Sequence, residues 1–382
     1  MLTSQRSKFS LPKGSIYLNC GYMSPLMKSV ERAGMKGMSE KRNPSTISAA
    51  DFFTTGELLR KEFAKLVNAP AANRIVIIPS ASYGLANAAN NIKLKRSENV
   101  IVAGEQFPSN YYPWHQLCKE TGATLKTISA PDTKTQRGKK WNEKILEAID
   151  SNTRLVALGN IHWADGTLFD LKKIRKRTLE TGTLLVIDGT QSVGALPFDI
   201  KVIQPDALIC AGYKWLMGPY SIGLAYYGPA FDNGKPIEEN WINRLNSEDF
   251  AGLVNYQEAY HHGSLRYEVG EHSNFILVPM LLEAIRQVNQ WGPKNIQTYC
   301  DKISGRAIAL LKKNGFWVED DSFRAKHLFG VRVPASKDIN AIKSKLQKNK
   351  ISVSYRGDAI RISPHLYNQE KDLMALARVL LS

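Results

Sequence analysis

Residues with reactive or ligand-binding side chains stand directly after four short apolar runs of the 382-residue chain. The runs are 75–78, 100–103, 184–187 and 207–210, and they are followed by Ala81 and Ser82, Phe107, Asp188 and Lys214. Short, continuous apolar runs are typical of strands buried on both faces of a parallel sheet. Ligands bind outside the carboxyl ends of such strands, so the sequence predicts that these side chains share one site.

These side chains suit different parts of one ligand. Lys214 follows Tyr213 in an apolar setting, where partial desolvation lowers the pKa of an amine and makes it a usable nucleophile. A carboxylate at Asp188 needs a cationic partner, such as a protonated ring nitrogen. Ser82 is expected to cap a helix whose free N–H groups bind phosphate, and Phe107 can stack on a flat ring. Each residue alone also fits an ordinary structural role, but together they are the parts of a pyridoxal-phosphate site.

The spacing of apolar residues predicts the elements that position this site. A fifth apolar run at 154–158 completes a buried sheet, and amphipathic stretches predict helices at 83–92, 112–121, 143–148 and 171–180. From about residue 278 the pattern changes to helices at 278–291, 296–313, 339–347 and 369–381 with strands at 316–318, 328–333, 351–355 and 360–363. We therefore expect an α/β protein with an N-terminal segment (1–15), a large mostly parallel-sheet domain (16–275) and a small C-terminal α+β domain (276–382).

The stretches 188–195, 206–214 and 218–227 resemble the class V aminotransferase family of fold-type I pyridoxal-phosphate enzymes. That family includes cysteine desulfurases, kynureninases and isopenicillin N epimerase-like proteins, and the resemblance runs from about residue 17 to about residue 368. It implies pyridoxal 5'-phosphate as the cofactor, an α-amino acid as the substrate and a homodimer with shared active sites. The loop 265–274 resembles the family's segment that reaches the partner's phosphate, and Ser273 or Asn274 would make that contact here.

The resemblance also implies a role for each cofactor-binding position. Lys214 would form the Schiff base, Asp188 would pair with the pyridine nitrogen and Gln191 would contact the ring hydroxyl. Ala81 and Ser82 would bind the phosphate at the start of their helix. Phe107 would stack on the ring and Tyr213 would reach the phosphate, as in the kynureninase-like members.

Three further residues are expected on the substrate side. The segment 359–368 resembles the family's carboxylate-binding motif, which makes Arg361 the group that binds the substrate carboxylate. In a strand, Arg361 faces away from Ile360 and Ile362, toward a cleft if those two are core residues. Trp163 is expected near the ring. His162 is either a substrate contact or acid/base group, or an ordinary loop histidine.

The reaction itself stays open at the level of sequence. A class V aminotransferase is favoured, and a kynureninase-like Cβ lyase or an epimerase is the alternative. Cysteine desulfurases need a reactive cysteine shortly before the arginine strand, but residues 301–382 contain no Cys, so that mechanism is disfavoured.

Composition bears on partners and location. The net charge of +16 suggests a noncatalytic nucleic-acid-binding relative as a different class, but the basic residues are scattered and not interleaved with aromatic ones, so nucleic acid is not expected. The longest apolar stretch, 275–282, is too short for a membrane helix. The N-terminus is polar, so no secretory signal is expected, and the four cysteines have no metal-ligand spacing. We expect a cytoplasmic protein without a metal site.

Overall fold

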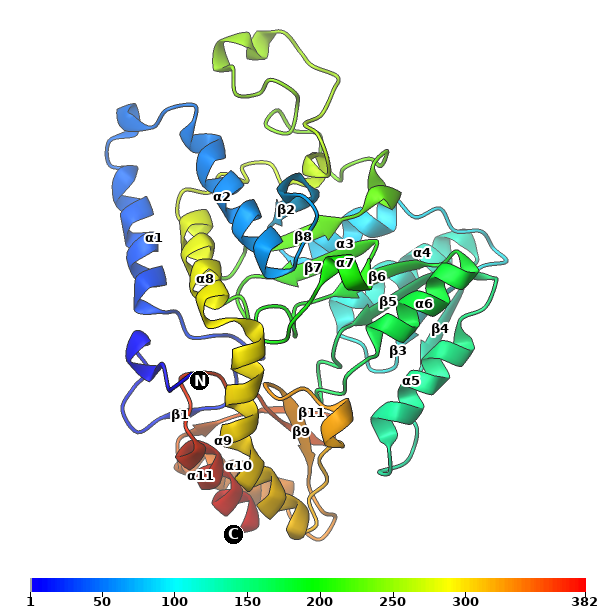
Figure 1. Cartoon of the computed structure of the whole chain (residues 1–382), viewed down its shortest axis with the longest axis vertical. Helices are drawn as coiled ribbons and strands as arrows, with labels where there is room; N and C mark the ends of the chain where they lie inside the picture. The colour runs from blue at the N-terminus through cyan, green and yellow to red at the C-terminus, as the bar shows by residue number, and fades with distance from the viewer. Residues whose placement is uncertain (1) are drawn as a thin grey trace.

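Residues 2–382 are described by a computed structural model, in which a large sheet flanked by helices lies beside a smaller C-terminal part (Figure 1). The helices are α1 (Lys28–Glu40), α2 (Asp51–Leu66), α3 (Ala81–Asn90), α4 (Tyr112–Thr121), α5 (Arg137–Ala148), α6 (Leu171–Thr181), α7 (Ile200–Ile203), α8 (Leu277–Trp291), α9 (Pro293–Lys313), α10 (Ile339–Lys348) and α11 (Glu370–Leu381). Those expected from sequence are found with shifts of up to six residues at their ends, whereas α1, α2 and α7 were not anticipated.

The large sheet has seven strands in the order β2-β8-β7-β6-β5-β3-β4. They are β2 (Ile75–Ile78), β3 (Asn99–Ala103), β4 (Thr124–Ile128), β5 (Thr153–Gly159), β6 (Leu184–Asp188), β7 (Ala207–Ala211) and β8 (Gly223–Tyr227). Only β8 runs antiparallel, to β2 and β7 on either side, so the prediction of a mostly parallel sheet is confirmed. The carboxyl ends of β2, β3, β5, β6 and β7 therefore lie at one edge.

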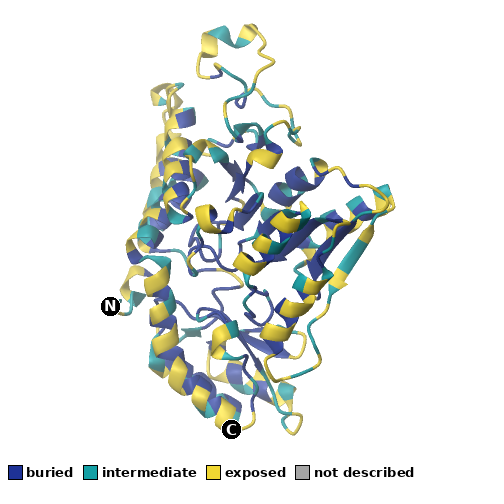
Figure 2. Cartoon of the chain, turned by 45° about the vertical axis from the view of Figure 1, so that its right-hand side comes forward, coloured by how far each residue is buried: buried dark blue, intermediate teal, exposed yellow. Residues whose placement is uncertain are grey.

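The sheet is buried on both faces, as the continuous apolar runs predicted. Alternate residues of each strand enter opposite clusters, because side chains alternate along a strand. Ile75, Ile77 and Val156 pack beneath α2, α5, α6 and α8, whereas Val76, Ile78 and Leu155 pack against α3 and α4. In Figure 2 the central strands are accordingly dark blue, whereas the edge strand β4 has no buried residue and is teal and yellow.

A smaller sheet lies in the C-terminal part, with β11 (Ser354–Arg356), β12 (Ala359–Ile362) and β9 (Phe329–Arg332) in that order. It packs with α9 and α11 around a third cluster that includes Val331, Ile360 and Ile362. The N-terminal strand β1 (Ile16–Tyr17) pairs in parallel with β10 (Ile351–Ser352) of this part. The predicted strand 316–318 is reduced to one isolated bridge between Trp317 and Arg332.

The segment 235–262 extends from the body of the molecule and is drawn at the top of Figure 1. It has little regular structure, and it exposes Val254 (79%) and Tyr256 (94%). Within residues 2–382, no helix has the length and apolar character required to cross a membrane.

Candidate active site

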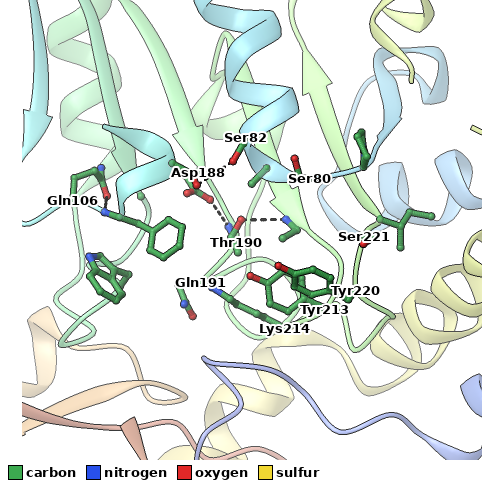
Figure 3. A pocket seen from close by; sticks show the side chains of 18 of the residues that line it. Ser80, Ser82, Gln106, Asp188, Thr190, Gln191, Tyr213, Lys214, Tyr220 and Ser221 are labelled. Atoms are coloured by element: carbon green, nitrogen blue, oxygen red, sulfur yellow. Dashed lines mark hydrogen bonds between the residues drawn. The ribbon is translucent and has the colours of Figure 1, made fainter. Parts of the chain in front are cut away.

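A cavity opens at the sheet edge where the carboxyl ends of the parallel strands meet. Its lining includes Ser82 after β2, Phe107 after β3, Asp188 at the end of β6 and Lys214 after β7. Figure 3 shows Asp188 and Ser82 on one side of this space and Lys214 with Tyr213 on the other. The structure thus brings together the residues that follow separate strands in the sequence.

Among residues 2–382, Lys214 is the one amine that lines the cavity, and no carboxylate of these residues forms an ion pair with it. It is only 5% exposed, and its Nζ lies among aromatic rings, 5.2 Å from the centroid of Phe107 and 5.4 Å from that of Tyr213. Burial lowers the pKa of Lys214 to about 8, although the charge of Asp188 opposes the shift. A substantial fraction of this amine is therefore neutral, and nucleophilic, at slightly alkaline pH.

Only one oxygen of the Asp188 carboxylate has a hydrogen-bond partner within residues 2–382. Its Oδ1 accepts the backbone N–H of Thr190 at 3.0 Å, and no hydrogen bond within residues 2–382 uses Oδ2. Burial raises the pKa of Asp188, while the bonds from Thr190 and the charge of Lys214 act in the opposite direction. A cationic ring nitrogen at this position would compensate the carboxylate for its lost hydration.

The N-terminus of α3 opens into the same cavity. Its N-cap is Ser80, whose Oγ accepts the N–H of Tyr83 at 3.1 Å, and not Ser82 as expected from sequence. Ser80 is the residue with extended backbone dihedrals, which an N-cap requires, and Ser82 is already helical. Ala81 and Ser82 therefore offer unbonded first-turn N–H groups, which suit a phosphate. The Ser82 hydroxyl donates to Ser109 Oγ at 3.0 Å.

Aromatic side chains form one wall. The rings of Phe107 and Trp163 meet edge to face with centroids 5.4 Å apart, and the Trp163 indole donates to the Glu105 carbonyl at 2.7 Å. Gln191 is fixed from both sides, since its Nε2 donates to the Gly21 carbonyl and its Oε1 accepts from Trp215 Nε1. The wall can hold a flat ring between an aromatic face and an oriented amide.

Tyr213 lies beside Tyr220 with ring centroids 4.6 Å apart. Burial raises the pKa of Tyr213 to about 12, so its hydroxyl keeps its proton at neutral pH and can donate a hydrogen bond. Tyr220 and Ser221 complete this side of the cavity and were not anticipated from the sequence.

A second cavity shares Phe107, Trp163 and Lys214 with the first. Arg361 lines it from β12 and is 1% exposed, while its neighbours Ile360 and Ile362 are core residues, as the strand alternation predicted. Arg361 Nη1 donates to the Trp163 carbonyl at 3.0 Å, and its buried Nε has no partner in the described part of the chain. A carboxylate in the second cavity would satisfy this guanidinium.

His162 lines neither cavity. Its Nε2 lies 3.2 Å from the carbonyl oxygens of Gly104 and Glu105, and its ring packs on Trp141. This geometry supports an ordinary loop histidine, and it does not support the predicted substrate contact. The backbone turn at this point directs Trp163 toward the cavity and the side chain of His162 into the interior.

Sequence reasoning missed Ser80, Thr190 and Arg356, which also line the cavities. The position of Thr190 two residues after Asp188 could have revealed its backbone bond to that carboxylate, since this spacing is typical of an Asx turn. Ser80 could have been found from its place directly after the first strand. No local signal places Arg356 there.

Comparison with known proteins agrees with this geometry. The Aminotransferase class-V family profile matches residues 40–378. An uncharacterized aminotransferase, YcbU, of Bacillus subtilis (strain 168) is 26% identical over 322 residues, which are 83% of this chain and 80% of that protein. A cysteine desulfurase of Escherichia coli (strain K12 / DH10B) is 25% identical over 260 residues, 67% of this chain and 61% of that protein.

Solved structures share the fold. A form of C-DES with glycine covalently linked to its PLP cofactor has a TM-score of 0.87 at 20% identity, covering 99% of both chains. The cystine C-S lyase C-DES in complex with cysteine persulfide gives 0.84 at 20% identity, covering 96% of this chain and 98% of that one. The cysteine desulfurase CsdA of Escherichia coli gives 0.81 at 18% identity, covering 98% and 96%.

The chain belongs to the class V aminotransferase family, whose cofactor is pyridoxal phosphate. The residues present fit that cofactor: a desolvated amine, a half-buried carboxylate, and a helix N-terminus all face one cavity, and within residues 2–382 one carboxylate oxygen and the N–H groups of Ala81 and Ser82 have no hydrogen-bond partner. The predictions of the family, the fold class and the cofactor are confirmed, and the protein is an enzyme of this family.

The low pKa of Lys214 predicts how cofactor attachment depends on pH. The neutral amine is the attacking form, so the rate at which added pyridoxal phosphate attaches to the apoprotein should rise with pH to a midpoint near 8, below the ordinary lysine value of 10.5. Stopped-flow absorbance across pH 6.5–10.5 measures this. In Asp188→Asn the midpoint should fall further, because the carboxylate that favours the charged amine is gone. A midpoint near 10.5 would contradict the burial argument.

Proposed function

We propose that this enzyme is an aminotransferase that acts on an α-amino acid through Lys214. The observation that carries the proposal is the junction of the two cavities: Lys214 lies where they meet, with Asp188 in the first and Arg361 in the second. Such an arrangement holds the substrate carboxylate at one end and leaves its α-carbon beside the lysine.

In this proposal the cofactor, when bound, supplies an electrophilic carbon for amines and a ring that accepts the electron pair of a broken Cα bond. Arg361 binds the substrate carboxylate and orients the amino acid. Lys214 would hold the cofactor covalently, and its neutral Nζ, when free, would take the proton from the substrate Cα. Asp188 would keep a proton on the ring nitrogen, which favours electron withdrawal, and Phe107 with Trp163 would exclude water from one side.

The runner-up is a Cβ lyase, favoured by Phe107 and Tyr213 at positions where the resemblance is to kynureninase-like proteins. Desulfurase action has less support, because it needs a reactive thiolate. All four cysteines are buried, and burial raises the pKa of Cys20 to about 12 and of Cys118 to about 11. Both thiols stay protonated at neutral pH and are weak nucleophiles.

One experiment separates these reactions. The purified protein with pyridoxal phosphate should show a visible absorption band from lysine-bound cofactor, which an amino acid alone converts once per site. An aminotransferase then needs a 2-oxo acid for further turnover, whereas a lyase keeps consuming the amino acid without one. Continued consumption of the amino acid in the absence of an acceptor would favour the lyase, and a protein with no visible band after cofactor addition would overturn the proposal.

The proposal includes a homodimer with shared sites. Apolar side chains are exposed on α1 (Met35 and Met38) and on the 235–262 segment (Val254 and Tyr256), and exposed apolar surface of this kind suits an interface. Just before α8, the Asn274 Oδ1 accepts the N–H groups of Ile276 and Leu277, which leaves its Nδ2 as the donor available to a phosphate. Ser273 and Asn274 both stay candidates for the partner's phosphate.

Sedimentation at low micromolar concentration is expected to give twice the 42.7 kDa chain mass, with a two-fold interface of over ~2,000 Å². Replacing Val254 and Tyr256 together by serine should weaken the dimer, whereas Leu179→Ser, at an exposed apolar residue of α6, should not. A 42.7 kDa monomer that retains cofactor at full occupancy would rule out shared sites.

A further inference from the structure

The second cavity contains two arginines and no carboxylate. Arg356 lines it together with Arg361, Tyr22 and Trp163. Within residues 2–382, neither guanidinium forms an ion pair, although the chain has 35 acidic residues. The Arg356 Nε is buried without a partner, as is that of Arg361, and Arg356 Nη1 donates only to the adjacent Tyr355 carbonyl. Buried donors of this kind are costly unless a ligand satisfies them.

The register of the small sheet places these arginines on one face. Ser354 of β11 stands opposite Arg361 of β12, and Arg356 is two residues from Ser354, so both arginines project from the same side. Their guanidinium carbons lie 5.2 Å and 6.0 Å from the centroid of the Trp163 ring. The charge of Arg356 also helps burial to lower the pKa of Arg361, to about 9. Two like charges close together destabilise each other.

Arg332 shows what the fold does with an arginine that has a structural role. It lies on the same face, since both Arg332 and Arg356 pair with Ala359 in the register. Arg332, however, is neutralised by Asp358 and lies 3.7 Å from Asp165. The two arginines that line the cavity differ from Arg332 in having no carboxylate partner within residues 2–382.

We propose that Arg356 binds a second acidic group of the substrate, so that the enzyme acts on dicarboxylic amino acids. This inference rests on the proposed function, in which Arg361 already binds the α-carboxylate. One carboxylate has two oxygens and fills the fork of one guanidinium. The second guanidinium beside the Trp163 ring then needs a second anion, which an acidic side chain supplies. Arg356 determines specificity in this arrangement, and it has no part in bond breaking.

The test compares each acid with its neutral amide of the same shape, glutamate with glutamine and aspartate with asparagine, on the protein loaded with pyridoxal phosphate. The readouts are the dissociation constant from the cofactor absorbance and kcat/KM. Wild type should prefer the acid by about 10- to 100-fold, the range expected for one charged hydrogen-bonded contact. Arg356→Gln should abolish that preference while changing the amide constants less than about threefold. Arg356→Lys should retain part of it, because the charge remains.

Two further variants serve as controls. Lys343→Gln removes a positive charge that lies 4.9 Å from the Tyr355 ring, on the opposite side of β11, and should leave the preference unchanged. Arg361→Gln should weaken acid and amide alike, since both have an α-carboxylate. Equal weakening of acid and amide by Arg356→Gln would overturn the inference, as both arginines would then hold the α-carboxylate. Equal affinity of wild type for acid and amide would overturn it too.

A binding measurement separates this inference from the proposed function. Glutarate has two carboxylates and no amino group, and butyrate has one carboxylate. Calorimetry should find glutarate bound more tightly than butyrate by wild type, and equally by Arg356→Gln. If that holds while no amino acid changes the cofactor spectrum, the reaction is misassigned and the dicarboxylate site stands. If amino acids react while glutarate and butyrate bind equally, the dicarboxylate site is wrong and the reaction stands.

Discussion

Replacing Lys214 by alanine is expected to remove covalent cofactor attachment and to lower turnover on the order of 10²- to 10⁴-fold, the usual contribution of a positioned proton-transfer group. Of the residues that the structure describes, Lys214 is the one with an amine in the cavity, so no other lining side chain can take over both its covalent and its proton-transfer role. Borohydride reduction followed by mass spectrometry measures the attachment directly.

Some noncovalent cofactor binding should survive in Lys214→Ala, because Asp188, Phe107 and the N-terminus of α3 remain. The exposed surface lysine Lys144 provides the matched control: Lys144→Ala should trap cofactor as wild type does. If Lys214→Ala still yields a cofactor adduct after reduction, another lysine is the anchor and the assignment of the site is wrong.

Replacing Asp188 by asparagine should slow removal of the Cα proton on the order of 10²- to 10³-fold, as losing a main electrostatic interaction does. Asparagine has nearly the same shape and can accept the Thr190 N–H bond, so the loss isolates the negative charge. The measurement is exchange of the substrate Cα proton with solvent deuterium, followed by NMR. Cofactor content should fall much less than the exchange rate.

The exposed carboxylate of Asp301 on α9 serves as the comparison, and Asp301→Asn should exchange at the wild-type rate. Loss of substrate affinity with an unchanged exchange rate in Asp188→Asn would show that Asp188 only shapes the cavity. It would then have no electronic role toward the ring.

The large sheet and the cofactor end of the site were predictable because their signals are local. A strand buried on both faces must be apolar at every position, so 75–78, 184–187 and 207–210 stand out. The residue that follows each strand then falls at the ligand-binding edge of a parallel sheet. Strand β8 was missed because Gly223 and two tyrosines interrupt the pattern. Nothing local shows that it runs antiparallel to β2 and β7.

The chain's own sequence therefore determined the cofactor end: Lys214, Asp188 and the start of α3 follow from which residues end apolar runs. Only the tertiary structure decided the substrate end. Arg356 and Arg361 are five residues apart, and alternation along one strand would put them on opposite faces. The chain instead reverses at Gly357, which has φ +55°, and antiparallel pairing of β11 with β12 returns Arg356 to the face of Arg361. Long-range register of this kind depends on the turn geometry and on packing against the 161–166 loop, which no periodicity in the sequence encodes.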